Sequence, residues 1–354
     1  MRKKTIVFIT PGIETGGAEK QLALLAKGLS QDGFVPLIIA LSKSGKGQRL
    51  ADFDGLRVVE INCRKFFQIV LAIHKIRHTI KIYKPDVIQG WMYAGNIMAS
   101  IAGVGIDAQI YHSLRASDMD AGRYGRIVKL NAILSGYTDG VIANSHAGAE
   151  HHISSGFPSS KISIIPNGID TNKFFPDKKS GNDIRRELGI TIGTPVVLYA
   201  ARVDPMKGHQ AVISVAKLCS GMKFIFVGKG TQCLDVPENV LTLGIRHDME
   251  KIYNACDLVI SFSEFGEGFP NVIGEAMACG TPVIANNVGD SWRVIGDTGY
   301  KIASYKDKAA VSELLETITG SLNKLPKSRI RKQITTSFSL ELMISRYKKE
   351  YLRV

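Results

Sequence analysis

Apolar and polar positions alternate with two different periods along this chain. Short apolar, β-branched runs predict strands, and longer stretches with apolar residues every three to four positions predict amphipathic helices. In the first half the expected strands are 5–10, 35–41, 58–62, 86–91, 109–113, 140–144 and 162–166, and the clearest helices are 18–31, 66–83 and 123–135. In the second half the expected strands are 195–201, 223–227, 258–261 and 282–285, and the helices are 207–219, 248–255, 272–279 and 340–351.

The regular order of strand and helix predicts parallel sheets with helices on both faces. We therefore expect an α/β fold of two Rossmann-like, doubly wound domains facing each other across a cleft, with ligands at the carboxyl ends of the strands. The expected domains are 1–168 and 195–338, joined by a linker at 169–194 that is rich in Gly, Pro, Asp and Lys and has no clear period. The sequence leaves open whether the last segment, 339–354, packs back on the first domain.

Two segments have to be weighed as targeting or membrane signals. The first twelve residues resemble a signal peptide only superficially, because their apolar run is too short, so they are expected to form a strand. Residues 87–106 carry no charge and are long enough to span a bilayer. Gln89, Asn96 and the glycines among them favour a buried strand followed by a helix instead.

Composition narrows the class of protein. With 45% hydrophobic and 22% charged residues, the chain is expected to be globular with a sizeable core. Its five cysteines are widely spaced and include no Cys-x-x-Cys pair, which argues against a disulfide framework or a zinc site, fits a reducing cytosol and predicts small apolar packing residues. The net charge of +13 indicates a polyanionic partner: nucleic acid, an anionic membrane surface or phosphorylated substrates.

The segment 264–285, EFGEGFPNVIGEAMACGTPVIA, carries the most specific chemistry. A strand ending near Ser263 leads into a Gly- and Pro-rich loop and a helix expected to begin at Asn271 as N-cap. The N–H groups and dipole of that helix end suit a diphosphate. Glu275, expected in the first turn, could accept hydrogen bonds from a ribose diol, and Glu267 from hydroxyls of an attached sugar. The residues expected to line this donor site with Glu275 are Gly268, Phe269, Pro270, Asn271 and Val272. The alternative is that Glu275 complements the helix dipole and Glu267 is a solvated loop acid.

This segment resembles the Glu-(seven residues)-Glu signature of glycosyltransferase family four, the retaining group 1 glycosyltransferases with the GT-B fold, of the bacterial surface-polysaccharide type. The segment 201–208, ARVDPMKG, resembles the family's phosphate clamp and maps Arg202 and Lys207 onto it. Two cations there would offset the charge that grows on a leaving nucleoside diphosphate. By this resemblance Glu267, Arg202 and Lys207 are expected to be catalytic.

The resemblance extends into the first half. The segment 163–170, SIIPNGID, matches the family's exit from the first domain, where Asn167 and Gly168 are expected to be structural. The segment 11–19, PGIETGGAE, resembles its glycine-rich loop, in which Gly16 and Gly17 would let backbone N–H groups approach the donor. It is not a Gly-x-Gly-x-x-Gly fingerprint, so no nicotinamide cofactor is expected.

Four further residues are assigned by position. His112 closes a predicted strand where family members often have a functional His and is expected to be catalytic, with packing or capping as the alternative. Arg115 would meet an acceptor phosphate or the donor diphosphate. Gly228, in the Gly-Lys-Gly loop, and Arg246 occupy regions where the family surrounds the diphosphate and the nucleobase.

No divalent metal and no other cofactor is expected to be required. The patterns 118–120 and 52–54 match a loose Asp-x-Asp metal motif, but patterns this short arise by chance. The Arg/Lys clamp would already supply the positive charge that a metal provides.

The basic charge gathers in 64–84, which contains the cations Arg64, Lys65, Lys75, Arg77, Lys81 and Lys84 and an apolar stripe of Phe66, Val70, Ile73, Ile76 and Ile80. One interpretation is docking on an anionic leaflet with Phe67 as an apolar contact, and the other is a core helix with a solvated basic face. Arg123, Arg126 and Lys129 extend the positive charge of this domain. Nucleic acid is not expected as a partner, because no recognition motif is present.

Together these features predict a hexosyl or N-acetylhexosaminyl transferase that moves a sugar, with retention, from a nucleotide sugar to a glycan. UDP-sugars are favoured and GDP-sugars come next. The acceptor is expected to be linked to a lipid diphosphate in O-antigen or capsule assembly, and the protein to lie on the cytoplasmic membrane face. A nucleotide-sugar epimerase of the same architecture and a non-enzymatic basic binding protein are the alternatives.

Overall fold

The computed structural model describes residues 3–14, 16–44, 51–63, 68–117, 121–305, 307, 311, 313, 315 and 325–353. The chain forms two compact units. One consists of Met1–Gly168 together with Leu340–Val354, and the other of Ile169–Ser339.

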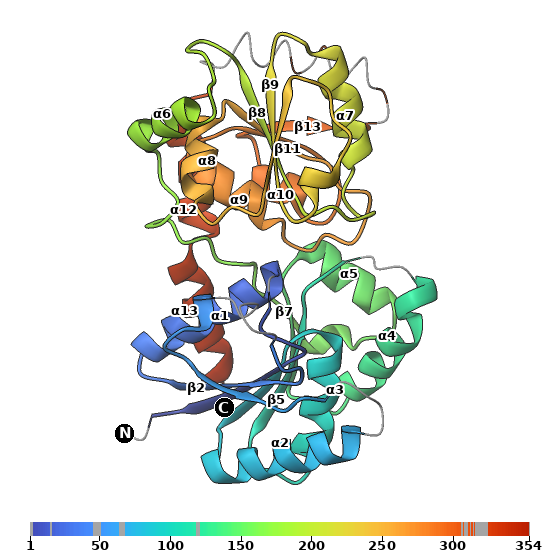
Figure 1. Ribbon diagram of the computed structural model, residues 1–354. Helices are drawn as coiled ribbons and strands as arrows, with labels where there is room; N and C mark the ends of the chain where they lie inside the picture. Colours follow the sequence, from blue (N-terminus) through green and yellow to red (C-terminus); the bar gives the residue numbers. More distant parts are fainter. Residues whose placement is uncertain are drawn as a thin grey trace. The chain divides into compact units, whose positions relative to one another are not determined.

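Within the described residues the first unit contains a seven-stranded sheet in the order β3-β2-β1-β4-β5-β6-β7, with parallel pairing throughout (Figure 1). Its strands are β1 (Thr5–Thr10), β2 (Val35–Ala40), β3 (Arg57–Glu60), β4 (Val87–Gly90), β5 (Gln109–Leu114), β6 (Gly140–Ala143) and β7 (Ile162–Ile164). Its helices are α1 (Gly17–Gln31), α2 (Ile69–Tyr83), α3 (Met92–Gly103), α4 (Ala121–Ser135), α5 (His146–Ser154) and α13 (Leu340–Tyr351), with short 3-10 turns η1 (Ala51–Phe53) and η3 (Ser159–Lys161).

Strand β1 lies in the middle of this sheet and all six of its residues are buried. Because successive side chains of a strand point to opposite faces, Ile6 and Phe8 pack with α1 and α13, whereas Val7 and Ile9 pack with α2 and α3. A strand buried on both faces reads as a continuous apolar run, as β1 does in the sequence.

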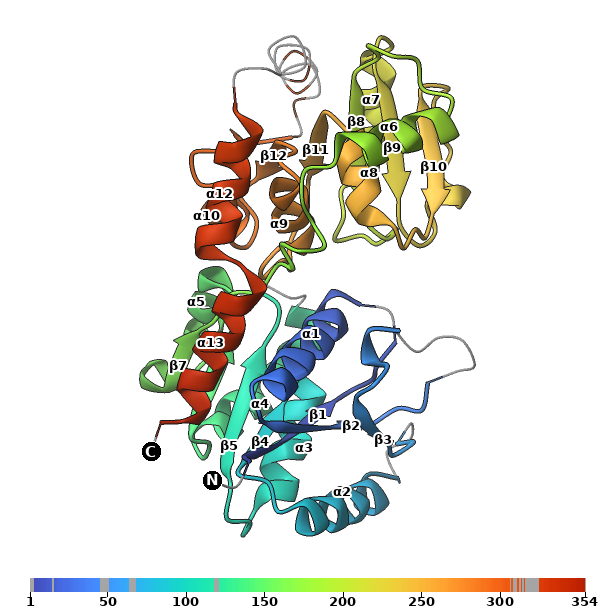
Figure 2. The same ribbon diagram turned by 90° about the vertical axis from the view of Figure 1, so that its left-hand side faces the viewer.

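Helix α13, at the end of the chain, belongs to the first unit. It lies beside α1 (Figures 1 and 2) and contributes Met343, Tyr347 and Tyr351 to the core. Lys4 Nζ donates to the carbonyl oxygen of Tyr351 at 3.1 Å. The last segment therefore packs on the first sheet, a point the sequence had left open.

The second unit contains, in its described part, a six-stranded parallel sheet in the order β10-β9-β8-β11-β12-β13. Its strands are β8 (Val196–Ala200), β9 (Lys223–Val227), β10 (Val240–Gly244), β11 (Leu258–Ser261), β12 (Val283–Asn286) and β13 (Tyr300–Ile302). Its helices are α6 (Lys178–Glu187), α7 (His209–Leu218), α8 (Met249–Ala255), α9 (Asn271–Ala278), α10 (Ser291–Ile295) and α12 (Lys327–Ser337), with a 3-10 turn η4 (Thr231–Cys233). One face of the sheet is covered by α7, and the other by α6, α8, α9, α10 and α12.

The predicted α/β fold with two doubly wound parallel sheets is confirmed. The expected linker, 169–194, is wrong: it belongs to the second unit and contains α6. Asp177 caps α6 by accepting from the N–H groups of Lys179 and Ser180, and Ile184 is buried in the core. This helix buries only Gly181 and Ile184, so its sequence shows no apolar period.

The uncharged segment 87–106 forms strand β4 and helix α3. In the described part of the chain we find no helix with the length and apolar character that crossing a membrane requires. Strands β10 and β13 and helix α12 were not predicted. Strand β13 has only three residues, and α12 buries only Ile330 and Ile334.

Candidate functional site

Two loops meet at the carboxyl edge of the second sheet. One follows β8 and leads to α7, and the other follows β11 and leads to α9. Gly208 N–H donates to Phe262 O at 3.1 Å, and Glu264 N–H donates to Met206 O at 2.8 Å. These backbone bonds hold the two sequence motifs, which are about sixty residues apart, against each other.

The predicted residues Lys207 and Glu267 meet where these loops join. Lys207 Nζ forms an ion pair with Glu267 Oε1, and Ser263 Oγ donates to the same oxygen at 2.9 Å. The side chains of Lys207 and Glu267 are 20% and 16% exposed, so the pair is largely shielded from water but still reachable. An ammonium and a carboxylate in contact at a strand edge can bind a phosphate oxygen and a hydroxyl side by side.

The backbone of Glu267 is held by a residue that the sequence did not single out. A Cβ on Gly289 would lie 2.3 Å from Glu267 O, and Gly289 has φ +60. The next residue, Asp290, donates its N–H to Gly268 O at 3.0 Å. Only glycine allows this approach, and its signal in the sequence is the Gly-Asp pair that follows β12.

Arg202 lies on the same loop as Lys207 but makes different contacts. Its Nε and Nη2 approach Asp204 Oδ2 at 3.1 and 3.0 Å, and 57% of its side chain is exposed. Burial alone would raise the pKa of Asp204, but hydrogen bonds from Met206 N–H and from Arg202 outweigh it and lower that pKa. Arg202 is thus an accessible cation whose present partner is a loop carboxylate.

The close approach of backbone near Arg202 depends on Gly228, at the end of β9. Gly228 has φ +146, and a Cβ there would lie 2.1 Å from Ala201 O and 2.8 Å from Arg202 N. The side-chain-free position lets the carboxyl ends of β8 and β9 approach closely. Gly228 therefore lies next to the expected phosphate clamp.

Glu275 lies in α9 and is 8% exposed. Tyr253 OH donates to Glu275 Oε2 at 2.9 Å. Burial, followed by the charge of Glu275, raises the pKa of Tyr253 well above its usual range, so Tyr253 remains a donor at neutral pH. The tyrosine thus orients the carboxylate, and no pattern in the sequence indicates this partner.

Two details of this helix were predicted wrongly. Pro270, not Asn271, is the N-cap residue of α9, and Glu275 is its fifth residue rather than part of the first turn. Asn271 and Val272 form the first turn and are partly exposed. Gly268 and Pro270 are buried. The side chain of Phe269 is 5% exposed and packs edge-on against Phe338 in the core, so only its backbone could meet a ligand.

The structure does not support the donor-binding role predicted for Arg246. Its guanidinium forms a bidentate pair with Asp248 at 2.8 and 2.7 Å and a further bond with Glu187 at 2.7 Å. These bonds, with Asp248 contributing most, raise the pKa of Arg246. Its donors tie the β10–α8 loop to α6, and this is a structural role.

His112 is also placed differently from the prediction. It is the fourth residue of β5, is fully buried, and its Nε2 lies 2.7 Å from Ser100 Oγ of α3. Burial lowers the pKa of His112 to about 4, with a hydrogen bond involving Asn96 acting in the opposite direction. The side chain points under α3 rather than to the strand end, a contact that fits the packing alternative, and the catalytic role of His112 stays a prediction.

Arg115 follows β5 and folds onto the first unit itself. Its Cζ lies 4.2 Å from the centre of the Trp91 ring, its Nη2 donates to Asn167 Oδ1 at 2.5 Å, and its Nη1 donates to Tyr347 OH at 3.3 Å. Burial lowers the pKa of Arg115. The predicted acceptor-side role is therefore not supported, because the guanidinium joins the exit of β7 to helix α13.

Gly16 and Gly17 lie at the start of α1, at the carboxyl edge of the first sheet. Gly16 is the N-cap residue in an extended conformation, and Gly17 is exposed. A Cβ on Gly16 would lie 2.0 Å from Glu19 Oε2. The absence of a side chain at Gly16 thus leaves room for the Glu19 carboxylate beside this helix end, and the donor-binding role of Gly16 and Gly17 stays a prediction.

Metal-ligating and cysteine side chains can be compared with the predictions only in the described part of the chain. There, no group of three or more His, Cys, Asp or Glu side chains is arranged to hold a metal ion. Asp52 is in η1 and Asp54 follows it, while 118–120 lies outside the described residues. The five cysteines form no disulfide within this part of the chain. Three are buried and Cys63 partly so, but Cys233 is exposed and so is not the packing residue that was expected.

The two doubly wound parallel sheets define a GT-B architecture. The family model described as Glycosyltransferase Family 4 matches residues 15–173, and the one described as Glycosyl transferases group 1 matches residues 194–319. The chain belongs to this glycosyltransferase family.

Several curated proteins are similar over part of the chain. The D-inositol 3-phosphate glycosyltransferase of Segniliparus rotundus is 32% identical over 148 residues, which is 36% of this chain and 32% of that protein. The N-acetyl-alpha-D-glucosaminyl L-malate synthase of Bacillus anthracis is 27% identical over 212 residues, 56% of this chain and 55% of that protein. The UDP-Gal:alpha-D-GlcNAc-diphosphoundecaprenol alpha-1,3-galactosyltransferase of Escherichia coli is 25% identical over 210 residues, 54% of each. The matches thus span 32% to 55% of the length of these relatives.

Solved structures share the fold over nearly the whole chain. Anabaena HepE in complex with UDP-glucose has a TM-score of 0.87 and 22% identity, and the match covers 98% of each chain. WaaG, a glycosyltransferase involved in lipopolysaccharide biosynthesis, has a TM-score of 0.74 and 15% identity over 99% of this chain and 100% of that one.

Proposed function

We propose that this protein is a retaining glycosyltransferase that moves a hexosyl or N-acetylhexosaminyl group from a nucleotide-sugar donor to a glycan acceptor. The observation that carries the proposal is the contact between Lys207 and Glu267, made by two loops that the backbone holds together. A cation suited to phosphate and a carboxylate suited to sugar hydroxyls lie side by side at the carboxyl edge of a parallel sheet, where α/β folds bind ligands.

The donor in this proposal is a UDP-sugar, with a GDP-sugar as second choice. Anabaena HepE was solved in complex with UDP-glucose, and the name of the E. coli relative begins with UDP-Gal. In the second unit, Glu275 would accept hydrogen bonds from the ribose diol while Tyr253 holds the other side of its carboxylate. Glu267 would accept hydrogen bonds from the transferred sugar.

Bond cleavage would place negative charge on the leaving nucleoside diphosphate. Lys207 and Arg202 are the cations to offset it. Arg202 would exchange Asp204 for the diphosphate, which its exposure allows, and Lys207 would contact the phosphate while retaining Glu267. We propose that no divalent metal is required, since these two cations supply the charge. Retention would proceed on the front face, with the leaving phosphate helping to deprotonate the acceptor hydroxyl, as the family resemblance implies.

The acceptor in this proposal is a glycan linked to a lipid diphosphate, in surface polysaccharide assembly. Two relatives support it by name: the E. coli enzyme acts on a diphosphoundecaprenol-linked sugar, and the Salmonella typhimurium relative is a lipopolysaccharide 1,2-N-acetylglucosaminetransferase that is 29% identical over 214 residues. An acceptor of this kind lies at a membrane surface.

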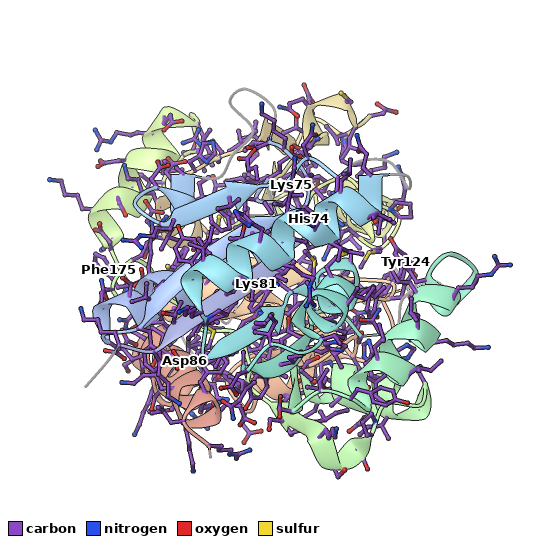
Figure 3. The ribbon with its side chains drawn as sticks, turned by 90° about the horizontal axis from the view of Figure 1, so that it is seen from below. His74, Lys75, Lys81, Asp86, Tyr124 and Phe175 are labelled. Carbon is purple, nitrogen blue, oxygen red and sulfur yellow. The ribbon has the colours of Figure 1, made fainter. Side chains whose placement is uncertain are left out.

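Helix α2 supports docking of the first unit on an anionic leaflet at the cytoplasmic membrane face. Figure 3 shows His74, Lys75 and Lys81 along this helix, and all three are exposed. The helix contains no acidic residue. Lysines on an exposed helix are attracted to anionic headgroups.

The apolar contacts differ from the stripe expected from the sequence. Ala72, Ile76 and Ile80 face the core, whereas Val70, Leu71 and Ile82 are 74%, 65% and 62% exposed. These three exposed side chains are therefore the apolar contacts we propose for the membrane. Phe66 and Phe67, with Arg64 and Lys65, lie outside the described residues.

Calorimetry with UDP, GDP and ADP tests the donor site. We expect UDP to bind most tightly, and Glu275→Ala to abolish binding while leaving the protein folded, with the unfolding midpoint lowered by the loss of the buried bond to Tyr253. Glu238→Ala removes an exposed carboxylate of the same unit and is the matched control. Unchanged UDP affinity in Glu275→Ala would contradict the proposed hydrogen bonds between Glu275 and the ribose.

Product analysis tests the reaction. With the UDP-sugar that binds best, we expect transfer to a sugar diphosphate with a short lipid chain, and we expect it to continue in EDTA. Epimerised donor in the absence of acceptor would favour the epimerase alternative, and full loss in EDTA restored by added metal would contradict metal independence.

A further inference from the structure

Three helices of the first unit begin just after β4, β5 and β6, at the carboxyl edge of the sheet, and they bring a second group of polar side chains together. Tyr93 is the second residue of α3, Tyr124 lies near the start of α4, and His152 lies in α5. The donor chemistry proposed above uses none of these residues. Both tyrosines are partly exposed, whereas His152 is fully buried.

A directed chain of hydrogen bonds links Tyr93, His152 and the backbone of Gly148. His152 Nδ1 lies 2.6 Å from Gly148 O, and His152 Nε2 lies 2.8 Å from Tyr93 OH. A carbonyl oxygen only accepts, so Nδ1 carries the proton of the neutral ring. Nε2 is then an acceptor, and Tyr93 has to donate its hydroxyl proton to it.

The histidine stays neutral, so this direction is maintained. Burial lowers the pKa of His152 to about 4, and its bond to Gly148 offsets this only in part. Burial, with a smaller contribution from Tyr124, raises the pKa of Tyr93 to about 12. Between these values Tyr93 remains a phenol whose single proton is committed to His152.

The backbone at the start of α5 and at the start of α3 fixes this geometry. A Cβ on Gly148 would lie 2.7 Å from Ser145 Oγ and 2.9 Å from Ala116 O, so only glycine lets the first turn of α5 pack against the chain after β5. On the other side Met92 has φ +61, a left-handed conformation that is costly for a side chain other than glycine. Strain of this kind persists where surrounding structure enforces it, and it gathers at ligand sites.

What Tyr93 offers a ligand is therefore specific. Its hydroxyl oxygen has two lone pairs and no second proton, so its remaining capacity is to accept a hydrogen bond. The partly exposed rings of Tyr93 and Tyr124 add apolar surface beside that oxygen. A sugar matches both features, because it carries hydroxyl donors on a ring with apolar C–H faces.

We propose that Tyr93 is a specificity-determining residue of the acceptor site and accepts a hydrogen bond from one hydroxyl of the acceptor sugar. His152 is the positioning residue, because its Nε2 accepts the hydrogen bond from the Tyr93 hydroxyl and so leaves that oxygen only as an acceptor. This inference rests on the proposed glycosyltransferase function and concerns only its acceptor. It holds whichever nucleotide the second unit binds.

Tyr93→Phe tests the proposal in the full chain. The probe acceptors are N-acetylglucosaminyl, glucosyl and galactosyl diphosphates with a short lipid chain, used with the UDP-sugar that binds best. Losing one hydrogen bond to a hydroxyl, worth roughly 1–3 kcal/mol, should lower kcat/KM for the acceptor about 10- to 100-fold. The donor KM and the slow hydrolysis of donor without acceptor should stay within about twofold, since these do not involve Tyr93. Tyr137→Phe, at a tyrosine that is 85% exposed in the same unit, is the matched control and should leave all three quantities unchanged.

A second pair of variants separates positioning from packing. His152→Gln can still accept from Tyr93 and donate to Gly148, so acceptor kcat/KM should recover to within a few-fold of wild type. His152→Leu keeps the apolar packing but releases the Tyr93 proton, and should resemble Tyr93→Phe.

The outcomes are distinguishable. Transfer with the same acceptor kinetics in wild type and Tyr93→Phe overturns the inference and leaves the proposed function standing. A lower unfolding midpoint in Tyr93→Phe with unchanged acceptor KM and kcat shows a packing role only and also overturns it. No transfer to any probe contradicts the proposed function itself, and the inference falls with it.

Discussion

Charged and titratable side chains near the carboxyl edges of the two sheets differ in whether they stay accessible. In the second unit Lys207 and Glu267 lie on loops beyond the strands, where the two side chains meet each other and stay reachable. In the first unit His112 lies within its strand and points under α3, while Arg115 folds against Trp91 and Asn167. Residues with equally suggestive chemistry thus stay reachable in one unit and make internal contacts in the other.

The difference depends on whether the residue lies within a strand or on the loop beyond it. A strand residue has only two directions available, and both faces of the first sheet are covered by helices, so the last four side chains of β5, which include His112, are buried whichever way they point. A residue beyond the strand end is placed by its loop. The loop that carries Lys207 is hydrogen-bonded to the loop after β11 through Gly208 N–H and Phe262 O. The side chain of Arg115 instead contacts the Trp91 ring and the Asn167 amide of its own unit.

The largest expected effect is in the second unit. If Lys207 acts as proposed, Lys207→Ala should lower turnover about 10²- to 10³-fold, because it removes one positive group that would stabilise the leaving diphosphate. Arg202→Ala should act in the same direction with a similar size. Steady-state rates with saturating donor measure this, and Lys217→Ala, an exposed lysine near the end of α7, is the control. Wild-type turnover in both Lys207→Ala and Arg202→Ala would refute the phosphate clamp.

In the first unit Arg115→Ala should act on stability. It leaves Asn167 and Tyr347 without the guanidinium and opens space beside Trp91, at a cost of roughly 3 kcal/mol. That corresponds to a fall in the unfolding midpoint of about 6–12 °C for a unit of this size. Differential scanning fluorimetry measures it, with exposed Arg202→Ala as the variant whose midpoint should barely move. An unchanged midpoint together with a raised acceptor KM would restore the ligand role and remove the contrast between the two edges.

The smallest expected effect is a pH dependence of stability from His112. Its folded pKa of about 4 lies below the value of 6.5 for an unperturbed histidine, so the unfolded chain takes up the proton first as pH falls. The stabilising contribution is complete above about pH 6.5 and is lost progressively toward pH 4. At pH 5 the stability already lost amounts to about 2 kcal/mol.

The unfolding midpoint of His112→Gln at pH 7 and pH 5 measures this. The variant should lose less stability on acidification than the wild type, and its turnover at pH 7 should remain near that of the wild type. A His112→Gln enzyme with an unchanged pH slope and lost turnover would mean that His112 reaches the substrate.

Much of the second-unit site could be predicted because its chemistry is local. The Glu-(seven residues)-Glu segment contains a loop, a helix start and both carboxylates within one short stretch. The partners of those carboxylates could not be predicted. Tyr253 lies 22 positions from Glu275, and their meeting depends on α8 packing beside α9. Lys207 lies 60 positions from Glu267, and their meeting depends on β8 and β11 being neighbours in the sheet.

The first unit shows the opposite case. The hydrogen bond from Arg115 to Tyr347 spans 232 positions and exists only because α13 packs on the first sheet. Nothing in the residues around Arg115 indicates this partner. The Tyr93–His152 bond spans 59 positions and depends likewise on the adjacent order of β4, β5 and β6.

By itself, the sequence determined the order and type of most elements, the two doubly wound sheets, the family and the stretch of chain that carries the two-glutamate motif. These properties depend on apolar period and on short motifs, which a chain expresses within about ten to twenty residues. Only the tertiary structure decided which charged side chains remain reachable, that 169–194 belongs to the second unit, and that the last helix completes the first. Those outcomes depend on which strands lie side by side and which faces the helices cover, and contacts between such distant segments leave no local period in the sequence.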